Sequence, residues 1–90
     1  MGAVARIIAD KLDAAFSPTR LKIIDDSGRH AGHAGAREGG ESHFSVVIES
    51  SAFDGLTRVA RQRLVYRALA EELSGPVHAL SLNVSAPGDA

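Results

Sequence analysis

The sequence predicts an α+β fold with the order α-β-β-α-α-β, in which helices cover one face of a three-stranded mixed sheet. Apolar residues recur at helical spacing in two stretches and alternate at strand spacing in three others. A helical stretch separates the last two strands, and such a crossover normally joins parallel strands. Ninety residues, 44% of them hydrophobic and 23% charged, fit a single globular domain over residues 1–90.

The first helix is predicted over residues 3–16 and the first strand over residues 20–26. The helix places apolar residues at the spacing of one face: Val4, Ile7, Ile8, Leu12, Ala15 and Phe16. Pro18 ends this helix, because proline disfavours helical geometry in the residue before it. The strand that follows has Leu21 and Ile23 on one side.

The periodicity disappears between residues 27 and 42. Five of the nine glycines fall there, beside His30 and His33, and no large apolar residue is present. We expect a long mobile loop, and loops of this length within small domains commonly carry function.

The second strand is predicted over residues 43–49, with Phe44, Val46 and Ile48 on one face and His43 at its start on the opposite face. It forms a hairpin with the first strand, so that the histidine-bearing loop is the tip of the hairpin. A turn over residues 51–56 follows.

Residues 57–74 are predicted to be helical, and the pattern allows a break near Ala60 that divides the stretch into two helices. The face expected to be apolar carries Val59, Tyr66, Leu69 and Leu73. Gly75-Pro76 ends the helical stretch. The third strand, over residues 77–84, places His78 on the same face as Leu80, Leu82 and Val84, and residues 86–90 are expected to fray.

Composition excludes several classes of function. The formal net charge is −1, cysteine is absent, and no apolar run approaches the roughly 20 residues that cross a bilayer. We therefore expect a soluble cytoplasmic domain without disulfides or thiolate ligands. The adjacent Ser42 and His43 are not expected to form a Ser-His-acid triad, because neighbouring strand residues point apart and no acid orients them. A glycine-rich phosphate loop is missing, so catalysis is not supported.

Two groups of residues remain as candidates for binding. His30, His33 and His78 are candidate metal ligands, although an isolated H-x2-H pair is weak evidence for zinc without thiolates. A basic helical segment carries four arginines that are candidates for phosphate contacts: Arg58, Arg61, Arg63 and Arg67. Each group has an ordinary alternative, namely a solvated loop, a half-buried strand histidine, or a solvated helix face.

Several segments together resemble the BolA family over about residues 4–87. They are Asp25-Asp26-Ser27-Gly28-Arg29-His30, Glu41-Ser42-His43-Phe44, Phe53-Asp54-Gly55-Leu56, Arg61-Gln62-Arg63, Ala70-Glu71-Glu72-Leu73 and Val77-His78-Ala79-Leu80. The resemblance implies a fold related to the KH domain and a non-catalytic role. It also implies pairing with a monothiol glutaredoxin, with glutathione, around a shared [2Fe–2S] cluster in iron–sulfur trafficking or iron sensing.

By the same resemblance, the family's C-terminal histidine corresponds to His78 and its loop histidine to His30, with His33 as a nearby competitor. Gln62 stands where the family usually has histidine, and the Gly-x-x-Gly loop by which KH domains bind nucleic acid is missing. Some members of the family are described as transcription regulators, so DNA binding through the four arginines is the alternative function. A structural binding module whose histidines have no role is the third.

Overall fold

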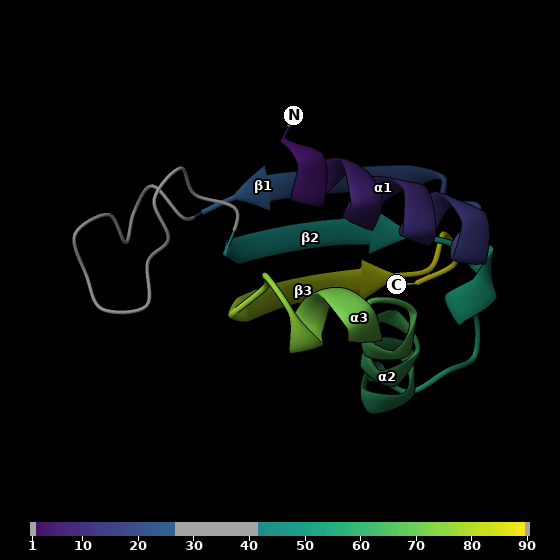
Figure 1. Cartoon of the computed structure of the whole chain (residues 1–90). Coiled ribbons are helices and arrows are strands. Elements are labelled where there is room, and N and C mark those ends of the chain that lie inside the picture. Colours follow the sequence, from purple (N-terminus) through teal and green to yellow (C-terminus); the bar gives the residue numbers. More distant parts are fainter. Residues whose placement is uncertain (1, 27–41, 90) are drawn as a thin grey trace.

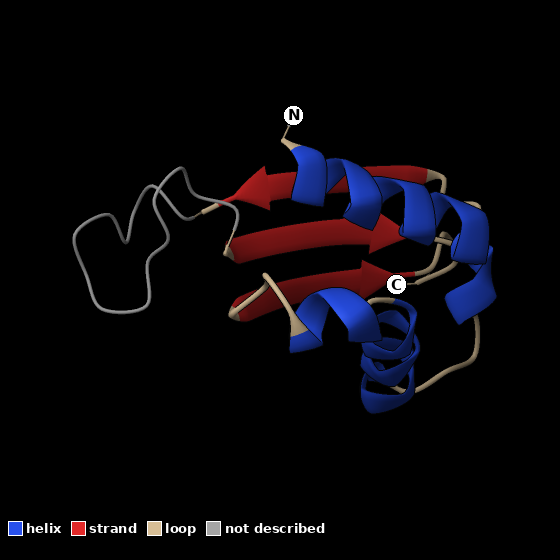
Figure 2. Cartoon of the chain, viewed as in Figure 1, coloured by secondary structure: helices blue, strands red, loops and turns tan. Residues whose placement is uncertain are grey.

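The computed structural model describes residues 2–26 and 42–89. The predicted order of elements is confirmed, and a short 3-10 helix is added after the second strand (Figures 1 and 2). The elements are α1 Ala3–Phe16, β1 Arg20–Asp25, β2 His43–Glu49, η2 Ser51–Phe53, α2 Arg58–Ala68, α3 Ala70–Ser74 and β3 Ala79–Ser85. Of the loop predicted over residues 27–42, only Ser42 lies within the described residues.

The three strands form one mixed sheet in the order β1-β2-β3, as predicted. β1 and β2 are antiparallel, with Leu21 opposite Ile48, whereas β2 and β3 are parallel, with His43 opposite Ala79. The start of β2, the start of β3 and the end of β1 therefore lie at the same end of the sheet.

One face of this sheet forms the core. Along β2, buried and half-buried residues alternate strictly, and the buried ones are Phe44, Val46 and Ile48. Figure 1 shows α1 crossing β1 and β2, while α2 and α3 lie beside β3. Ile8 and Leu12 of α1 are fully buried against this face, as is Val65 of α2. Burial of apolar area between the helices and the sheet is the main force that stabilises this arrangement.

The helical stretch after the turn divides at Leu69 and not near Ala60, so the predicted position of the break is wrong. Leu69 is buried and has φ −107° and ψ 20°, which ends α2 and starts α3 in a new direction. The predicted apolar face is also wrong in part, because Val59 and Tyr66 are exposed. Val65 and Leu69 provide the buried contacts instead.

No helix in the described part of the chain is long and apolar enough to span a bilayer.

Three predicted strand limits shift slightly. β1 ends at Asp25, one residue early, whereas β3 begins at Ala79, two residues late, and ends at Ser85, one residue late. The delay has a clear cause: the N–H of Val77 donates to the carbonyl of Glu72 (2.9 Å), so Val77 belongs to the turn after α3 and not to the sheet ladder.

Adjacent isoleucines in α1 offer a direct test of the predicted core. Ile8 is fully buried, whereas Ile7 is 44% exposed. We expect Ile8→Ala to lower the free energy of unfolding by about 2–4 kcal/mol, and Ile7→Ala to lower it by less than about 1 kcal/mol. Chemical denaturation followed by circular dichroism measures both.

The two substitutions change helix propensity by the same amount, so the difference between them reports burial alone. Equal losses of stability would contradict the position of α1 on the sheet.

Candidate functional site

Two histidines meet at the end of the sheet where β2 and β3 begin. His43 is the first residue of β2, and His78 directly precedes β3. Their imidazole rings are nearly parallel, with an interplanar angle of 16° and 6.3 Å between ring centroids. The parallel pairing of the two strands brings them together from positions 35 residues apart in the chain, which is the difference between 78 and 43.

Ser42 organises both histidines. It is fully buried, and its carbonyl accepts hydrogen bonds from the N–H groups of His78 (2.7 Å) and Ala79 (3.2 Å). A further hydrogen bond joins the Ser42 hydroxyl oxygen to Nδ1 of His43 (2.8 Å). One buried residue thus holds the backbone of one histidine and the ring of the other.

The turn before β3 restrains His78 from the other side. Val77 is buried in the core, and its N–H and that of Gly75 both donate to the carbonyl of Glu72. The Glu72 carboxylate accepts hydrogen bonds from the Lys11 ammonium of α1, and these bonds raise the pKa of Lys11. His78 is therefore an exposed side chain on a backbone fixed at the residues before and after it.

The chain leaves β1 beside His43. The N–H of Asp26 donates to the carbonyl of His43 (2.7 Å), and the hydroxyl of Ser45 donates to the Asp26 carboxylate. Asp26 and Ser42 are the described residues that flank positions 27–41. Asp26 is therefore anchored to His43, and Ser42 is anchored to both His43 and His78.

The predicted metal ligands have different outcomes. His78 is accessible at this end of the sheet; the alternative interpretation of a half-buried histidine on the Leu80 face is wrong, because its exposed ring lies against His43. His30 and His33 lie outside the described residues. The sequence analysis placed His43 only on the strand surface. Its position beside His78 could have been predicted, because the second and third strands both start near a histidine and pair in parallel.

The described residues alone do not complete a metal site. They contain no group of three or more histidine, aspartate or glutamate side chains able to hold an ion. Imidazole is a ligand type that can replace thiolate on one iron of a [2Fe–2S] cluster, as in Rieske centres, and the described site offers the exposed His78 with His43 beside it.

Of the four arginines considered for nucleic acid, Arg61 is engaged within the protein. Its guanidinium forms a two-contact ion pair with Asp89, and its Nε donates to the carbonyl of Leu56 (3.0 Å). Arg58 lines a pocket next to β3, whereas Arg63 and Arg67 are exposed on α2. Three guanidinium groups are left to meet an external phosphate.

Residues 86–89 do not fray in the way expected for residues 86–90. Ala86 is buried, and its N–H donates to the carboxylate of Asp89 (3.0 Å), while the N–H of Asp89 donates back to the Ala86 carbonyl (3.0 Å). The hydrogen bonds from Arg61, followed by that from Ala86, lower the pKa of Asp89 to about 2. The ion pair of Asp89 with Arg61 of α2 is the physical reason why these residues are docked and not frayed.

Comparison with known proteins shows consistent similarity. The family model described as BolA-like protein matches residues 12–89. Human BolA-like protein 1 is 46% identical over 87 residues, which are 97% of this chain; the chain spans only 61% of the human protein's length. The Escherichia coli (strain K12) DNA-binding transcriptional regulator BolA is 49% identical over 76 residues, covering 84% of this chain and 69% of that protein.

Solved structures give the same result. The BolA domain of SufE1 from Arabidopsis thaliana superimposes with a TM-score of 0.88 at 38% sequence identity, covering 100% of this chain and 99% of that one. The α+β fold with its three-stranded mixed sheet is therefore shared with known structures.

The ion pair between Arg61 and Asp89 predicts a specific pH dependence. The pKa of Asp89 is about 2, below the ordinary 3.8, so the pair stabilises the fold above about pH 4 and loses this effect as pH falls through about 2. A double-mutant cycle with Arg61→Gln and Asp89→Asn isolates the coupling free energy. We expect it to favour folding at about pH 5 and to be clearly smaller at about pH 2.5.

Denaturant unfolding of the four proteins at both pH values measures the coupling. The cycle subtracts the hydrogen bonds that each residue makes elsewhere, to Leu56 and to Ala86. A coupling that is the same at both pH values would show that the Asp89 carboxylate is not stabilised by Arg61.

Proposed function

This chain belongs to the BolA family, and we propose that it co-ligates a [2Fe–2S] cluster with a monothiol glutaredoxin. BolA proteins form a non-catalytic family, so the role proposed is that of a binding partner in iron–sulfur trafficking or iron sensing. The cluster is cargo that passes through the complex, with glutathione as an accessory ligand on the glutaredoxin side.

One observation carries the proposal: the imidazole of His78 is exposed, while its backbone is fixed by Ser42 and by the buried Val77. A metal ligand needs an accessible donor atom whose position changes little between the loaded and empty states. The segment with His30 and His33 follows Asp26, which bonds to His43, and precedes Ser42, whose carbonyl accepts from His78, and we assign the second ligand to this segment.

The chemistry of the donor atoms agrees with a shared site. The chain has no cysteine and cannot supply sulfur itself. A [2Fe–2S] cluster needs four ligands, of which two can be histidines on one iron. We assign His78 and either His30 or His33 to this chain, and the sulfur ligands to the glutaredoxin and glutathione.

His43 has a supporting role in this proposal. Its ring stacks against His78 and is tied to the hydroxyl of the buried Ser42. Orientation of a metal ligand by its neighbours affects both affinity and the properties of the metal. We therefore regard His43 as the residue that limits the rotation of the His78 ring.

DNA binding is the second candidate. The observation in its favour is that Arg63 and Arg67 are exposed one turn apart on α2, and the E. coli relative is named a DNA-binding transcriptional regulator. Against it, Arg61 is paired with Asp89 and the formal net charge is −1. DNA binding through these arginines requires an affinity that falls steeply with salt.

Compartment is part of the proposal as well. The cytoplasm remains our prediction for this chain. Relatives have other assignments, as shown by Arabidopsis thaliana proteins named BOLA1, chloroplastic, and SufE-like protein 1, chloroplastic/mitochondrial.

Substitution of His78 tests the ligand assignment. We expect His78→Ala to reduce the iron and sulfide content of the complex co-purified with the host's monothiol glutaredoxin and to change its visible circular dichroism. His78→Cys should retain a cluster with a shifted spectrum, because a thiolate replaces the imidazole as ligand. Far-UV circular dichroism and co-purification of the partner control for folding and pairing.

The second ligand is identified by replacing His30 and His33 singly with alanine. The ligand is the histidine whose loss reproduces the effect of His78→Ala, and the other variant serves as its matched control. A cluster spectrum and iron content that are identical in wild type, His78→Ala and His78→Cys would refute the assignment of His78.

A further inference from the structure

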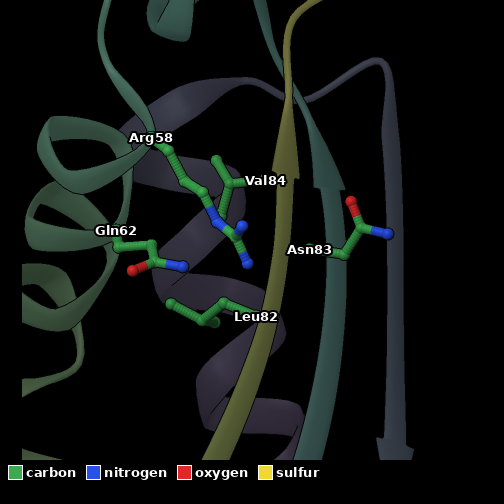
Figure 3. Close-up of a pocket in the computed structure, with 5 residues that line it drawn as sticks. All are labelled: Arg58, Gln62, Leu82, Asn83 and Val84. Carbon is green, nitrogen blue, oxygen red and sulfur yellow. The ribbon is translucent and has the colours of Figure 1, made fainter.

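The outer edge of β3 borders a pocket that is separate from the histidines. The pocket has a volume of about 260 Å³ and is lined by Arg58, Gln62, Leu82, Asn83 and Val84. In Figure 3 the side chains of Arg58 and Gln62 extend from α2 towards β3, and those of Leu82 and Val84 extend from β3 towards α2, whereas Asn83 points away. The pocket therefore combines an apolar wall with two polar groups, one of them cationic.

The backbone of β3 is unpaired along this edge. β3 is an outer strand of the sheet, and its Ala79 and Ser85 make hydrogen bonds to residues 42 and 50 on the β2 side. Alternate residues of a strand bond to the same neighbour, so the odd-numbered residues of β3 face β2. The N–H and C=O groups of Leu80, Leu82 and Val84 consequently point outwards, and no other strand among the described residues pairs with them.

Arg58 gives this edge a positive charge that no carboxylate in the described part of the chain neutralises. The described ion pairs join Lys11 to Glu71 and Glu72 and Arg61 to Asp89, and none includes Arg58. Because Asp89 is already bound by Arg61, it does not compensate Arg58. A guanidinium beside an amide group is well suited to bind a carboxylate through paired N–H donors.

We infer that the outer edge of β3 binds an extended, acidic segment of a partner protein. The segment adds a fourth strand to the sheet through the outward backbone groups of Leu82, and places an aspartate or glutamate side chain on Arg58 and Gln62. Addition of a strand to an exposed sheet edge is a common mode of peptide recognition, in which side-chain pockets provide the specificity.

Two other occupants fit these observations less well. Nucleic acid phosphates offer only acceptors, whereas the edge of β3 presents N–H donors and C=O acceptors alternately. A second copy pairing through its own β3 would leave Arg58 unmatched, because the strand Ala79–Ser85 has no acidic residue. The extended acidic peptide satisfies both the backbone groups and the charge.

The site is also distinct from the proposed cluster site. Val84 lies five residues along β3 from Ala79, which corresponds to about 16 Å at the rise of a strand. The carboxylate bound at Arg58 therefore lies towards the opposite end of β3 from the exposed His78. This inference does not depend on the cluster, since it concerns the apo protein.

A library of capped heptapeptides with alternating valine and threonine and a central glutamate tests the inference. Titration of the full chain, followed by amide nitrogen–proton NMR spectra, should shift the outward amides of Leu80, Leu82 and Val84. We expect Arg58→Gln to weaken binding about tenfold, as for loss of one charge-assisted hydrogen-bonded pair. Arg63→Gln, an exposed arginine on the same helix, is the matched control and should bind like wild type.

Peptides with glutamine in place of glutamate should also bind about tenfold more weakly. The inference is overturned if no library member shifts the outward amides, or if Arg58→Gln binds as tightly as wild type. Tighter binding of a DNA duplex at the same amides would assign the edge to nucleic acid. A concentration-dependent sedimentation coefficient that Leu82→Lys abolishes would assign it to self-association.

Discussion

The start of the β2–β3 pair depends on one buried residue, Ser42. Its carbonyl accepts the first two N–H groups at the beginning of β3, and its hydroxyl binds the ring of His43. A buried polar group without hydrogen-bond partners destabilises a protein. Because the carbonyl and the hydroxyl of Ser42 find their partners at His78, Ala79 and His43, formation of the sheet is coupled to the positions of both histidines. In the described part of the chain no other residue contacts both histidines through hydrogen bonds.

This coupling explains how the exposed imidazole of His78 is held on a fixed backbone. The buried residues of β2 pack against α1 and hold the strand in place, and the buried Val77 holds the turn before β3 in place. The exposed imidazole is therefore supported by residues that contribute to the free energy of folding. The same contacts stabilise the fold and position this imidazole.

The sequence predicted the order of elements because each element has a periodicity that its own residues determine. Alternation at Phe44, Val46 and Ile48 required no knowledge of the rest of the fold. The division of the helical stretch at Leu69 was missed because it depends on how the chain turns to bury that side chain. The exposure of Val59 and Tyr66 follows from the same turn, which local periodicity does not contain.

The sequence identified only part of the candidate site, again because some contacts depend on the tertiary structure. His78 was identified from its resemblance to a family position, whereas its contact with His43 arises only when β2 and β3 pair in parallel. The ion pair of Arg61 with Asp89 joins residues 28 positions apart and converts an expected frayed end into a docked one. Contacts of this kind depend on tertiary structure and leave no local pattern.

β3 connects the exposed imidazole at one end to the pocket at the other without an intervening loop or hinge. A strand hydrogen-bonded to β2 along its whole length is stiff, so the two ends keep a constant separation and a constant relative orientation. Any molecule bound near Val84 is thereby held at a fixed distance and orientation from the imidazole of His78. The secondary structure itself would set the geometry of an encounter between two macromolecules on this small scaffold.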